Sequence, residues 1–306
     1  METTTAVRQH EHFTVERHPD IPRMNRIRPS GEALRRFFEV CAEVGVQELE
    51  YVPYMRFVLA GELRGIFGEE FAKTVRNILR DRNTGAFTIG VREAARSADD
   101  YVKFATALVH LVGIPNHDAM SGKYYARFAV QDTDNSDSYL RQAYRLFTLH
   151  TDGTFVDEET DWLLMMKMEE RHAVGGESRL LHLDDWEELD QFLSHPLARH
   201  RFLYKAPKSK NVETTVERST FFEADGRPCI CFIDQFVYPE TIEQAQYLRA
   251  LSQSMERSRA VATMELPVGS LVMINNLFWV HGRAPFEKNE KLYRELMRLR
   301  GRFADV

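Results

Sequence analysis

The spacing of apolar side chains changes near residue 120 and divides the chain into two parts. Before that point, apolar residues recur at the three- and four-residue intervals of amphipathic helices. The pattern predicts one helix after Ser30, which is expected to cap it, a second that includes 71–79, and a third that begins near Ser97. One strand is expected at 86–91. The N-terminal third is therefore predicted to be rich in helix.

After residue 120 the chain consists of short apolar runs separated by turn-forming residues. These runs predict strands at 124–130, 146–150, 162–168, 179–183, 202–205, 220–223, 229–233, 271–275 and 294–300. The dipeptide Asp225-Gly226 between two of them is a hairpin turn signal. Helices are expected at 185–193 and 240–257. Many short, evenly spaced strands favour a sandwich or jelly roll over alternating βαβ units.

Residues 1–29 show no hydrophobic period and contain three prolines, so we expect them to form a loosely ordered arm. The remaining chain contains no internal repeat and no clear linker. Residues 30–306 are therefore predicted to form a single domain that is mainly β with α (α+β). Its helical part is expected to cover about 30–115, and its β part about 120–304.

Composition narrows the function classes. Of 306 residues, 43% are hydrophobic, which is enough for a sizeable core and too many for a disordered chain. The formal net charge of −6 argues against a general binder of nucleic acid or of membrane surfaces, because it repels phosphate. The three cysteines, Cys41, Cys229 and Cys231, form neither a disulfide framework nor a CxxC zinc motif. They are expected to be ordinary buried thiols.

Neither a membrane span nor an export signal is expected. No segment approaches the roughly 18 consecutive apolar residues of a transmembrane helix. The N-terminus lacks the apolar core of a signal peptide. The cytoplasm is therefore the expected location, with no membrane partner.

A candidate metal site begins at His150-Thr151-Asp152. Residues two apart on an extended strand point to the same face, so His150 and Asp152 can present an imidazole and a carboxylate together. His281 is the expected third ligand. Two histidines and one carboxylate on one face of an octahedral ion leave three positions open, as in non-haem iron(II) oxygenases. A second HxD motif begins at His182, but it runs into a predicted helix, where one of its aspartates is expected to act as the cap.

An unusual set of arginines follows the distal histidine. On an extended strand, Arg294, Arg298 and Arg300 share one face with Leu296. Burying guanidinium groups is costly unless anions meet them, and arginine binds carboxylates through two parallel hydrogen bonds. Two interpretations stay open: a solvated sheet face with ordinary ion pairs, or a set of carboxylate clamps beside the metal.

The order of these motifs resembles the clavaminate synthase and taurine dioxygenase group of 2-oxoglutarate oxygenases. The first arginine follows His281 by 13 residues, and Gly175-Gly176-Glu177-Ser178 resembles the group's GGDT turn. The resemblance implies that Arg294 and Ser178 bind the distal carboxylate of 2-oxoglutarate and that Arg298 binds an acidic substrate. The alternative in which Arg300 takes the role of Arg294 stays open.

Longer blocks are similar to the carbon-starvation-induced glutarate 2-hydroxylase family. They lie at 118–128, 135–142, 163–168, 182–187, 275–279 and 294–298. The resemblance implies a double-stranded β-helix (jelly-roll) fold flanked by helices, a homotetramer, and the cofactors Fe(II), 2-oxoglutarate and O₂. It also implies conversion of glutarate to (S)-2-hydroxyglutarate, with release of succinate and CO₂, in lysine catabolism.

Two residues before the candidate metal site are further candidates for substrate contacts. Arg127 and Tyr125, on the strand predicted at 124–130, are candidate substrate ligands. The same machinery acting on an amino acid would need a carboxylate for the ammonium group, and Asp134, Asp137 and Asp157 are candidates. A jelly-roll protein that senses a dicarboxylate without catalysis is another alternative. The intact His150, Asp152 and His281 argue against it, because a pure binder does not need an open iron site.

Overall fold

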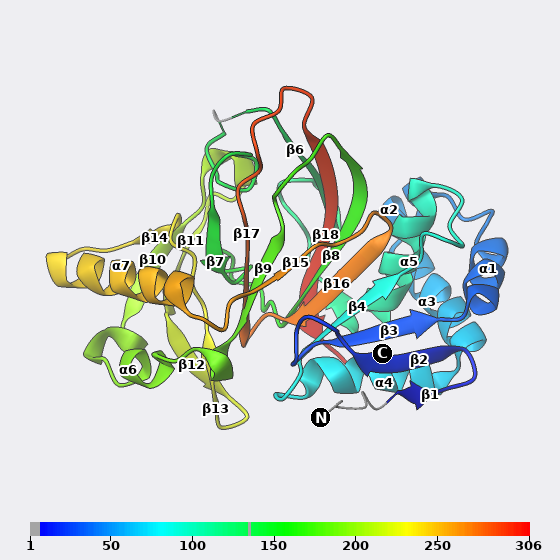
Figure 1. Cartoon of the computed structure of the whole chain (residues 1–306), viewed down its shortest axis with the longest axis horizontal. Coiled ribbons are helices and arrows are strands. Elements are labelled where there is room, and N and C mark those ends of the chain that lie inside the picture. Colours follow the sequence, from blue (N-terminus) through cyan, green and yellow to red (C-terminus); the bar gives the residue numbers. More distant parts are fainter. Residues whose placement is uncertain (1–6, 134–135) are drawn as a thin grey trace.

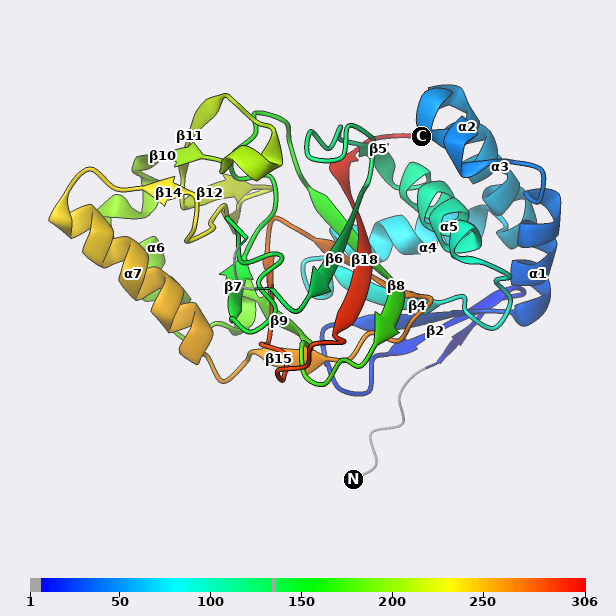
Figure 2. The same cartoon turned by 90° about the horizontal axis from the view of Figure 1, so that it is seen from above.

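The computed structural model describes residues 7–133 and 136–306. Its helical part lies to one side of a large sheet (Figures 1 and 2). The helices there are α1 (Gly31–Val40), α2 (Val46–Tyr51), α3 (Pro53–Phe67), α4 (Glu69–Arg80) and α5 (Ala98–His110). Ser30 caps α1 as predicted, because its hydroxyl accepts a hydrogen bond from the Ala33 amide. The predictions of α1, α4 and α5 are confirmed, whereas α2 and α3 were not predicted.

The large sheet has the strand order β1-β2-β3-β4-β16-β8-β18-β5, and β6 also pairs with β18. Its strands are β1 (Arg8–Gln9), β2 (Phe13–Arg17), β3 (Asn25–Pro29), β4 (Ala86–Gly90), β5 (Gly113–Pro115), β6 (Ala126–Gln131), β8 (Trp162–Arg171), β16 (Ser270–Asn275) and β18 (Tyr293–Phe303). A second sheet faces it, in the order β15-β9-β17-β7. Its strands are β7 (Phe147–His150), β9 (Ser178–His182), β15 (Ala262–Met264) and β17 (Trp279–Arg283). The two sheets form the jelly-roll core, as predicted.

The large sheet is buried on both faces, which explains the continuous apolar runs in its central strands. On β8, Leu164 and Met166 pack against the helices, whereas Leu163 and Met165 point into the space between the sheets. Successive side chains of a strand point to opposite faces, so one run of residues contributes to two cores. The helices therefore hold the large sheet in place from the side opposite the second sheet.

A smaller outer part lies beyond the second sheet (Figure 1). It contains the strands β10 (Arg201–Lys205), β11 (Thr215–Ser219), β12 (Phe221–Ala224), β13 (Arg227–Ile230) and β14 (Val237–Tyr238), and the helices α6 (Leu189–Leu193) and α7 (Ile242–Arg257). Asp225 and Gly226 connect β12 to β13 with φ angles of 51° and 69°. Both angles are positive, as a two-residue hairpin turn requires, so the predicted hairpin is confirmed. Within the described residues, no helix has the length and apolar character needed to cross a membrane.

The expectation of a loosely ordered arm over residues 1–29 is wrong for residues 8–29. Strands β2 and β3 pair with each other, and β3 pairs in parallel with β4. Phe13 and Ile27 are buried in the core beneath the helices. Pro19 and Pro22 lie in the connection between the two strands, and Pro29 ends β3. The prolines therefore mark turns and a strand end, as proline does at sheet edges, rather than disorder.

Replacement of Ile27 by alanine tests the structural role of β3. Ile27 is 1% exposed, so the cavity left by Ile27→Ala should lower the free energy of unfolding by about 2–5 kcal/mol. Val7→Ala is the control, because Val7 is 55% exposed and its loss should change that free energy by less than about 0.5 kcal/mol. Urea denaturation measures both. Equal stabilities of the two variants would show that β3 is not part of the folded core.

Candidate active site

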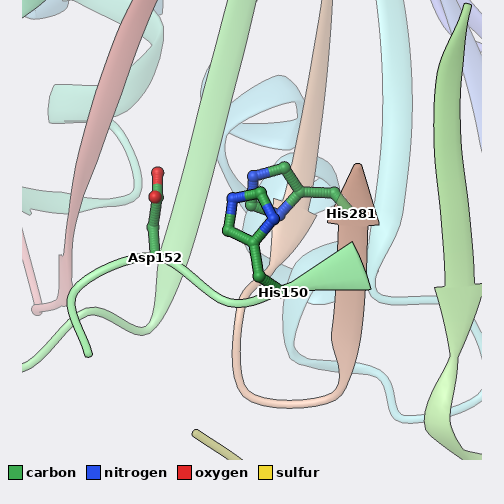
Figure 3. Close-up of side chains that lie close together, drawn as sticks. All are labelled: His150, Asp152 and His281. Atoms are coloured by element: carbon green, nitrogen blue, oxygen red, sulfur yellow. The ribbon is translucent and has the colours of Figure 1, made fainter. Parts of the chain in front are cut away.

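Two histidines meet across neighbouring strands. His281 on β17 lies directly opposite His150, the last residue of β7, in an antiparallel pair. The centroids of their rings are 4.2 Å apart. Figure 3 shows the two imidazoles side by side, with Asp152 on the loop that follows β7. The sheet register therefore joins two residues that are far apart in the sequence.

Asp152 lies past the end of β7, not within an extended strand as the sequence suggested. Gly153 has a φ of 79°, and a Cβ there would collide with the side chain of Thr160, so the turn requires glycine. The side chain of Asn276 holds this turn. Its Oδ1 accepts from the Asp152 amide at 2.9 Å, and its Nδ2 donates to the carbonyls of Asp152 at 3.0 Å and Thr160 at 2.8 Å.

His150, Asp152 and His281 can each direct one ligand atom to a common point. Those atoms lie within 4.8 Å of one another, and no other such group of at least three occurs among the described residues. His150 Nδ1 is 2.7 Å from the Thr148 carbonyl, which can only accept, so Nδ1 carries the proton and Nε2 keeps its lone pair. Nδ1 of His281 is buried and has no hydrogen-bond partner among the described residues. The donor set fits a divalent metal.

The charge states also suit a metal. Burial lowers the pKa of His281 to about 3, with a further contribution from His150. Burial lowers the pKa of His150 as well. For Asp152, burial raises the pKa, but Arg298, His281 and other nearby groups lower it by more, so it lies well below its ordinary value. At neutral pH the site therefore offers two neutral imidazoles and one carboxylate.

Arg298 ties the carboxylate of Asp152 to that of Asp118. Its Nη1 is 3.3 Å from Asp152 Oδ2, and its Nη2 is 2.7 Å from Asp118 Oδ2. All three side chains are at most 10% exposed. Burial lowers the pKa of Arg298, but the two carboxylates raise it by more. Arg298 therefore stays charged and orients Asp152, a role that the sequence did not reveal.

The cavity beside the three candidate metal ligands continues along β18 to Arg294. Arg294 is 5% exposed and donates through Nη1 to the carbonyl of Gly176. Gly176 has a φ of 72°, and a Cβ there would collide with the ring of Phe286, so the predicted glycine turn is needed for this contact. Ser178, at the start of β9, lines the same cavity. Burial lowers the pKa of Arg294 to about 10, so it remains a cation at neutral pH.

The structure does not bring Arg127 or Tyr125 to this cavity. The guanidinium of Arg127 forms two hydrogen bonds with Glu295, at 2.9 and 2.8 Å, and is 38% exposed. The hydroxyl of Tyr125 donates to Glu50. Their assignment as substrate ligands is corrected, because each side chain is already paired with a carboxylate elsewhere.

The other candidates also have defined places. Arg300 is 4% exposed, its guanidinium carbon is 6.0 Å from the centre of the Phe155 ring, and it is not among the residues that line the cavity. His182 is bonded to the Arg82 carbonyl at 2.9 Å and accepts from the Asp184 amide at 3.1 Å, so it is a structural histidine. Asp137 accepts from the Ser209 amide and Asp157 is exposed, whereas Asp134 lies outside the described residues.

Two cavity-lining cations were missed by the sequence analysis. Arg283 donates to the carbonyls of Leu140 at 2.8 Å and Gln142 at 2.5 Å, while its Nε has no partner among the described residues. It follows His281 by two residues on the same strand, and that spacing was the available signal. Lys210 ends the short 3₁₀ turn Lys208–Lys210, which is too short for a sequence pattern to indicate the direction of its side chains.

A wider cavity of about 840 Å³ lies between β3, β4 and the segment 263–268. Its walls include Arg26, Arg28, Arg35 and Arg92, but none of the candidate metal ligands. The three candidate metal ligands line the smaller cavity between the two sheets instead.

Comparison with known proteins identifies the family. The CsiD family model matches residues 13–303. The chain belongs to the CsiD family. Among curated relatives, a glutarate 2-hydroxylase of Citrobacter koseri is 46% identical to this chain over 286 residues, covering 92% of this chain and 88% of the relative. One of Salmonella paratyphi B is 44% identical over 306 residues, covering 99% and 94%.

Solved structures share the fold at low sequence identity. Asparagine oxygenase in complex with Fe(II), hydroxyasparagine and succinate has a TM-score of 0.72 and 14% identity, covering 90% of this chain and 93% of that one. A mutant of the non-haem iron oxygenase OrfP in complex with hydroxyarginine has a TM-score of 0.69 and 16% identity, covering 90% of this chain and 92% of that one. At this level of sequence identity, the likeness to these two structures establishes the fold of this CsiD family member and nothing more.

Removal of single side chains tests the metal centre. His150→Ala, Asp152→Ala and His281→Ala should each weaken binding of Fe(II) or Co(II) by more than about 10–100-fold, the effect of losing only an outer-shell partner. His182→Asn is the control, because the asparagine oxygen can still accept from the Asp184 amide. Anaerobic metal titration measures the affinities. Loss of metal in His182→Asn with retention in His150→Ala would place the site at the other HxD motif.

Proposed function

We propose that this protein is an Fe(II)- and 2-oxoglutarate-dependent dioxygenase that hydroxylates glutarate at C2 to (S)-2-hydroxyglutarate. The observation that carries the proposal is the buried His150–Asp152–His281 group in a cavity lined by basic side chains. Membership of the CsiD family and the names of the curated relatives support the substrate. The proposed iron ligands are His150, Asp152 and His281.

The cosubstrate is proposed to occupy the Arg294 end of the cavity. Arg294 offers a buried Nε that has no partner among the described residues, and Ser178 lines the same space. A planar guanidinium with a nearby hydroxyl suits the distal carboxylate of 2-oxoglutarate. Arg283, whose Nε is also unpaired among the described residues, adds a second cation at this end.

Charge balance favours a dianionic substrate over an amino acid. The described residues that line the cavity include the cations Lys210, Arg283, Arg294 and Arg298, and Asp152 is the carboxylate among them. Asp152 is a proposed metal ligand, and the nearby Asp118 is paired with Arg298. No free carboxylate in this lining can therefore meet a substrate ammonium group, whereas carboxylates would relieve the excess positive charge.

The residues of the chain bind, orient and exclude water, and the bound iron with 2-oxoglutarate and O₂ supplies the oxidation. One oxygen atom of O₂ enters the substrate as hydroxyl and the other enters succinate, while CO₂ leaves the cosubstrate. Arg298 holds Asp152 in place and partly faces the cavity, so it is also the first candidate for a substrate carboxylate. Burial between two sheets keeps bulk water from the reacting carbon.

We propose further that the chain acts in the cytoplasm, in glutarate and lysine breakdown, as a homotetramer. An exposed apolar patch on α2 and α3 supports assembly, since such patches mark interfaces. It consists of Tyr51, Tyr54, Phe57 and Val58, which are 45–74% exposed.

Light scattering should give four times the chain mass of 35.6 kDa, and Tyr54→Arg should lower that mass. A wild-type monomer at micromolar concentration would contradict the tetramer and leave the active site unaffected.

Succinate release tests the reaction. With Fe(II), 2-oxoglutarate and O₂, glutarate should cause release of one succinate per hydroxyglutarate formed. Arg294→Lys should raise the KM for 2-oxoglutarate at least about tenfold, or ~1.4 kcal/mol, because lysine lacks the two-pronged donor. The KM for glutarate should change less.

Arg127→Lys is the matched control for this test, since Arg127 lies on β6, which pairs with β18, and is paired with Glu295 outside the cavity. It should leave both KM values unchanged. An enzyme that ignores glutarate and hydroxylates an amino acid would refute the substrate. If the protein with iron releases no succinate when either glutarate or an amino acid is added, a sensing protein is favoured instead.

A further inference from the structure

Lys210 is held over the cavity by a short segment that is fixed on both sides. The segment Lys208–Lys210 is a turn of 3₁₀ helix, followed by Asn211 in the left-handed region with a φ of 52°. The Ser209 amide donates to Asp137 at 3.1 Å, and Asn211 Nδ2 donates to the Ala119 carbonyl at 3.3 Å. These contacts turn Lys210 inward, where it is 7% exposed and lines the cavity with His150 and His281.

The ammonium group of Lys210 has no carboxylate partner among the described residues. Its hydrogen-bond contact is the Met120 sulfur, at 3.9 Å, and a thioether is a weak acceptor. The nearby carboxylates, Asp118 and Asp152, are both bound by Arg298. A buried cation without a strong partner destabilises the folded protein, so its presence in a binding cavity points to an anion from outside.

The surroundings of Lys210 separate it from the proposed cosubstrate end. Arg294 and Arg298 are four residues apart on β18, or roughly 13 Å at about 3.3 Å per residue. The pKa of Lys210 is lowered to about 8, first by burial and then by Arg298, whereas Arg294 is influenced by other charges. The groups that act on Lys210 are Arg298, Asp152, Asp118 and Arg141, and those that act on Arg294 are Glu170 and Glu177. Lys210 therefore belongs to the Arg298 end.

We propose that Lys210 binds the substrate carboxylate remote from the hydroxylated carbon and thereby selects a dicarboxylate over a monocarboxylate. The inference rests on the proposed function. Arg298 contacts Asp152 and so lies next to the metal ligands, which leaves it closer to the reacting carbon. Lys210 makes no hydrogen bond to the three metal ligands, so it suits the carboxylate at the other end of the chain of methylenes.

The test compares glutarate with pentanoate, which has a methyl group in place of one carboxylate. In Lys210→Met, the ratio of kcat/KM for glutarate to that for pentanoate should fall at least about thirtyfold, since losing the partner of a buried charge costs about 2 kcal/mol or more. The KM for 2-oxoglutarate should change less than about threefold. Lys208→Met is the matched control, because Lys208 is exposed in the same turn, and its ratio should equal that of the wild type.

Two further measurements separate recognition from a structural role. Lys210→Met should have a thermal midpoint equal to or above that of the wild type without ligands, because it removes an unpaired buried charge. Lys210→Arg should keep the preference for the dicarboxylate, because it keeps the cation. If Lys210→Met does not fold, Lys210→Gln provides a neutral, polar substitute for the same comparison.

The outcomes distinguish this inference from the proposed function. A wild-type protein that releases no succinate with glutarate refutes the proposed function and the inference with it. If the wild type hydroxylates glutarate and Lys210→Met and Lys210→Gln keep its preference over pentanoate, the inference alone is wrong. It is also wrong if these variants raise the KM for 2-oxoglutarate instead, because Lys210 then binds the cosubstrate.

Discussion

The excess of buried positive charge between the two sheets is the constraint on which this site depends. Lys210, Arg283, Arg294 and Arg298 line a cavity in which Asp152 is the carboxylate. The protein neutralises part of this charge itself, through the pairs of Arg298 with Asp118 and Asp152. The remaining donors include buried nitrogens of Arg294 and Arg283 that have no partner among the described residues. Such a cavity is costly when empty, and anionic ligands that bind the folded chain stabilise it by mass action.

Two strands, β17 and β18, carry most of the charged side chains of this cavity. β17 carries His281 and Arg283 two residues apart, and β18 carries Arg294 and Arg298 four residues apart. Even spacings put the members of each pair on one face, toward the space between the sheets. The helices pack on the opposite face of the large sheet, in which β18 pairs with β8. A one-residue slip of β18 would turn both arginines into the apolar core against the helices.

Hydrophobic pattern and ligand chemistry were sufficient to predict much of this arrangement. Long, regular apolar series made four elements predictable, and the structure confirms them: the strands β8 and β16 and the helices α4 and α7. The cluster of His150, Asp152 and His281 was predicted from residue type and spacing, although Asp152 lies in a turn. Strand periodicity gave the common face of Arg294 and Arg298, because alternation is a local property of the backbone.

The sequence could not show which side chains contact one another when they are far apart in the sequence. Arg127 lies opposite Met297, so it points to the helix side of the large sheet, where Glu295 on the neighbouring strand forms an ion pair with its guanidinium. Asp118 lies in a loop and Lys210 in a short 3₁₀ turn, where side-chain direction follows from tertiary contacts such as that between Asn211 and Ala119. Residues 8–29 were misjudged because two short strands with prolines around them show too little periodicity to be recognised without β4 beside them.

The most direct test of this division of the cavity is a crystal structure of the complex with 2-oxoglutarate, glutarate and Mn(II), where Mn(II) replaces Fe(II) and the crystals are grown without oxygen. We predict the metal on His150, Asp152 and His281, with the distal carboxylate of 2-oxoglutarate at Arg294. Glutarate should extend from Arg298 toward Lys210, so that each end of the cavity holds one dianion. A metal bound elsewhere, or a single dianion that spans from Arg294 to Lys210, would contradict the division of the cavity into cosubstrate and substrate ends.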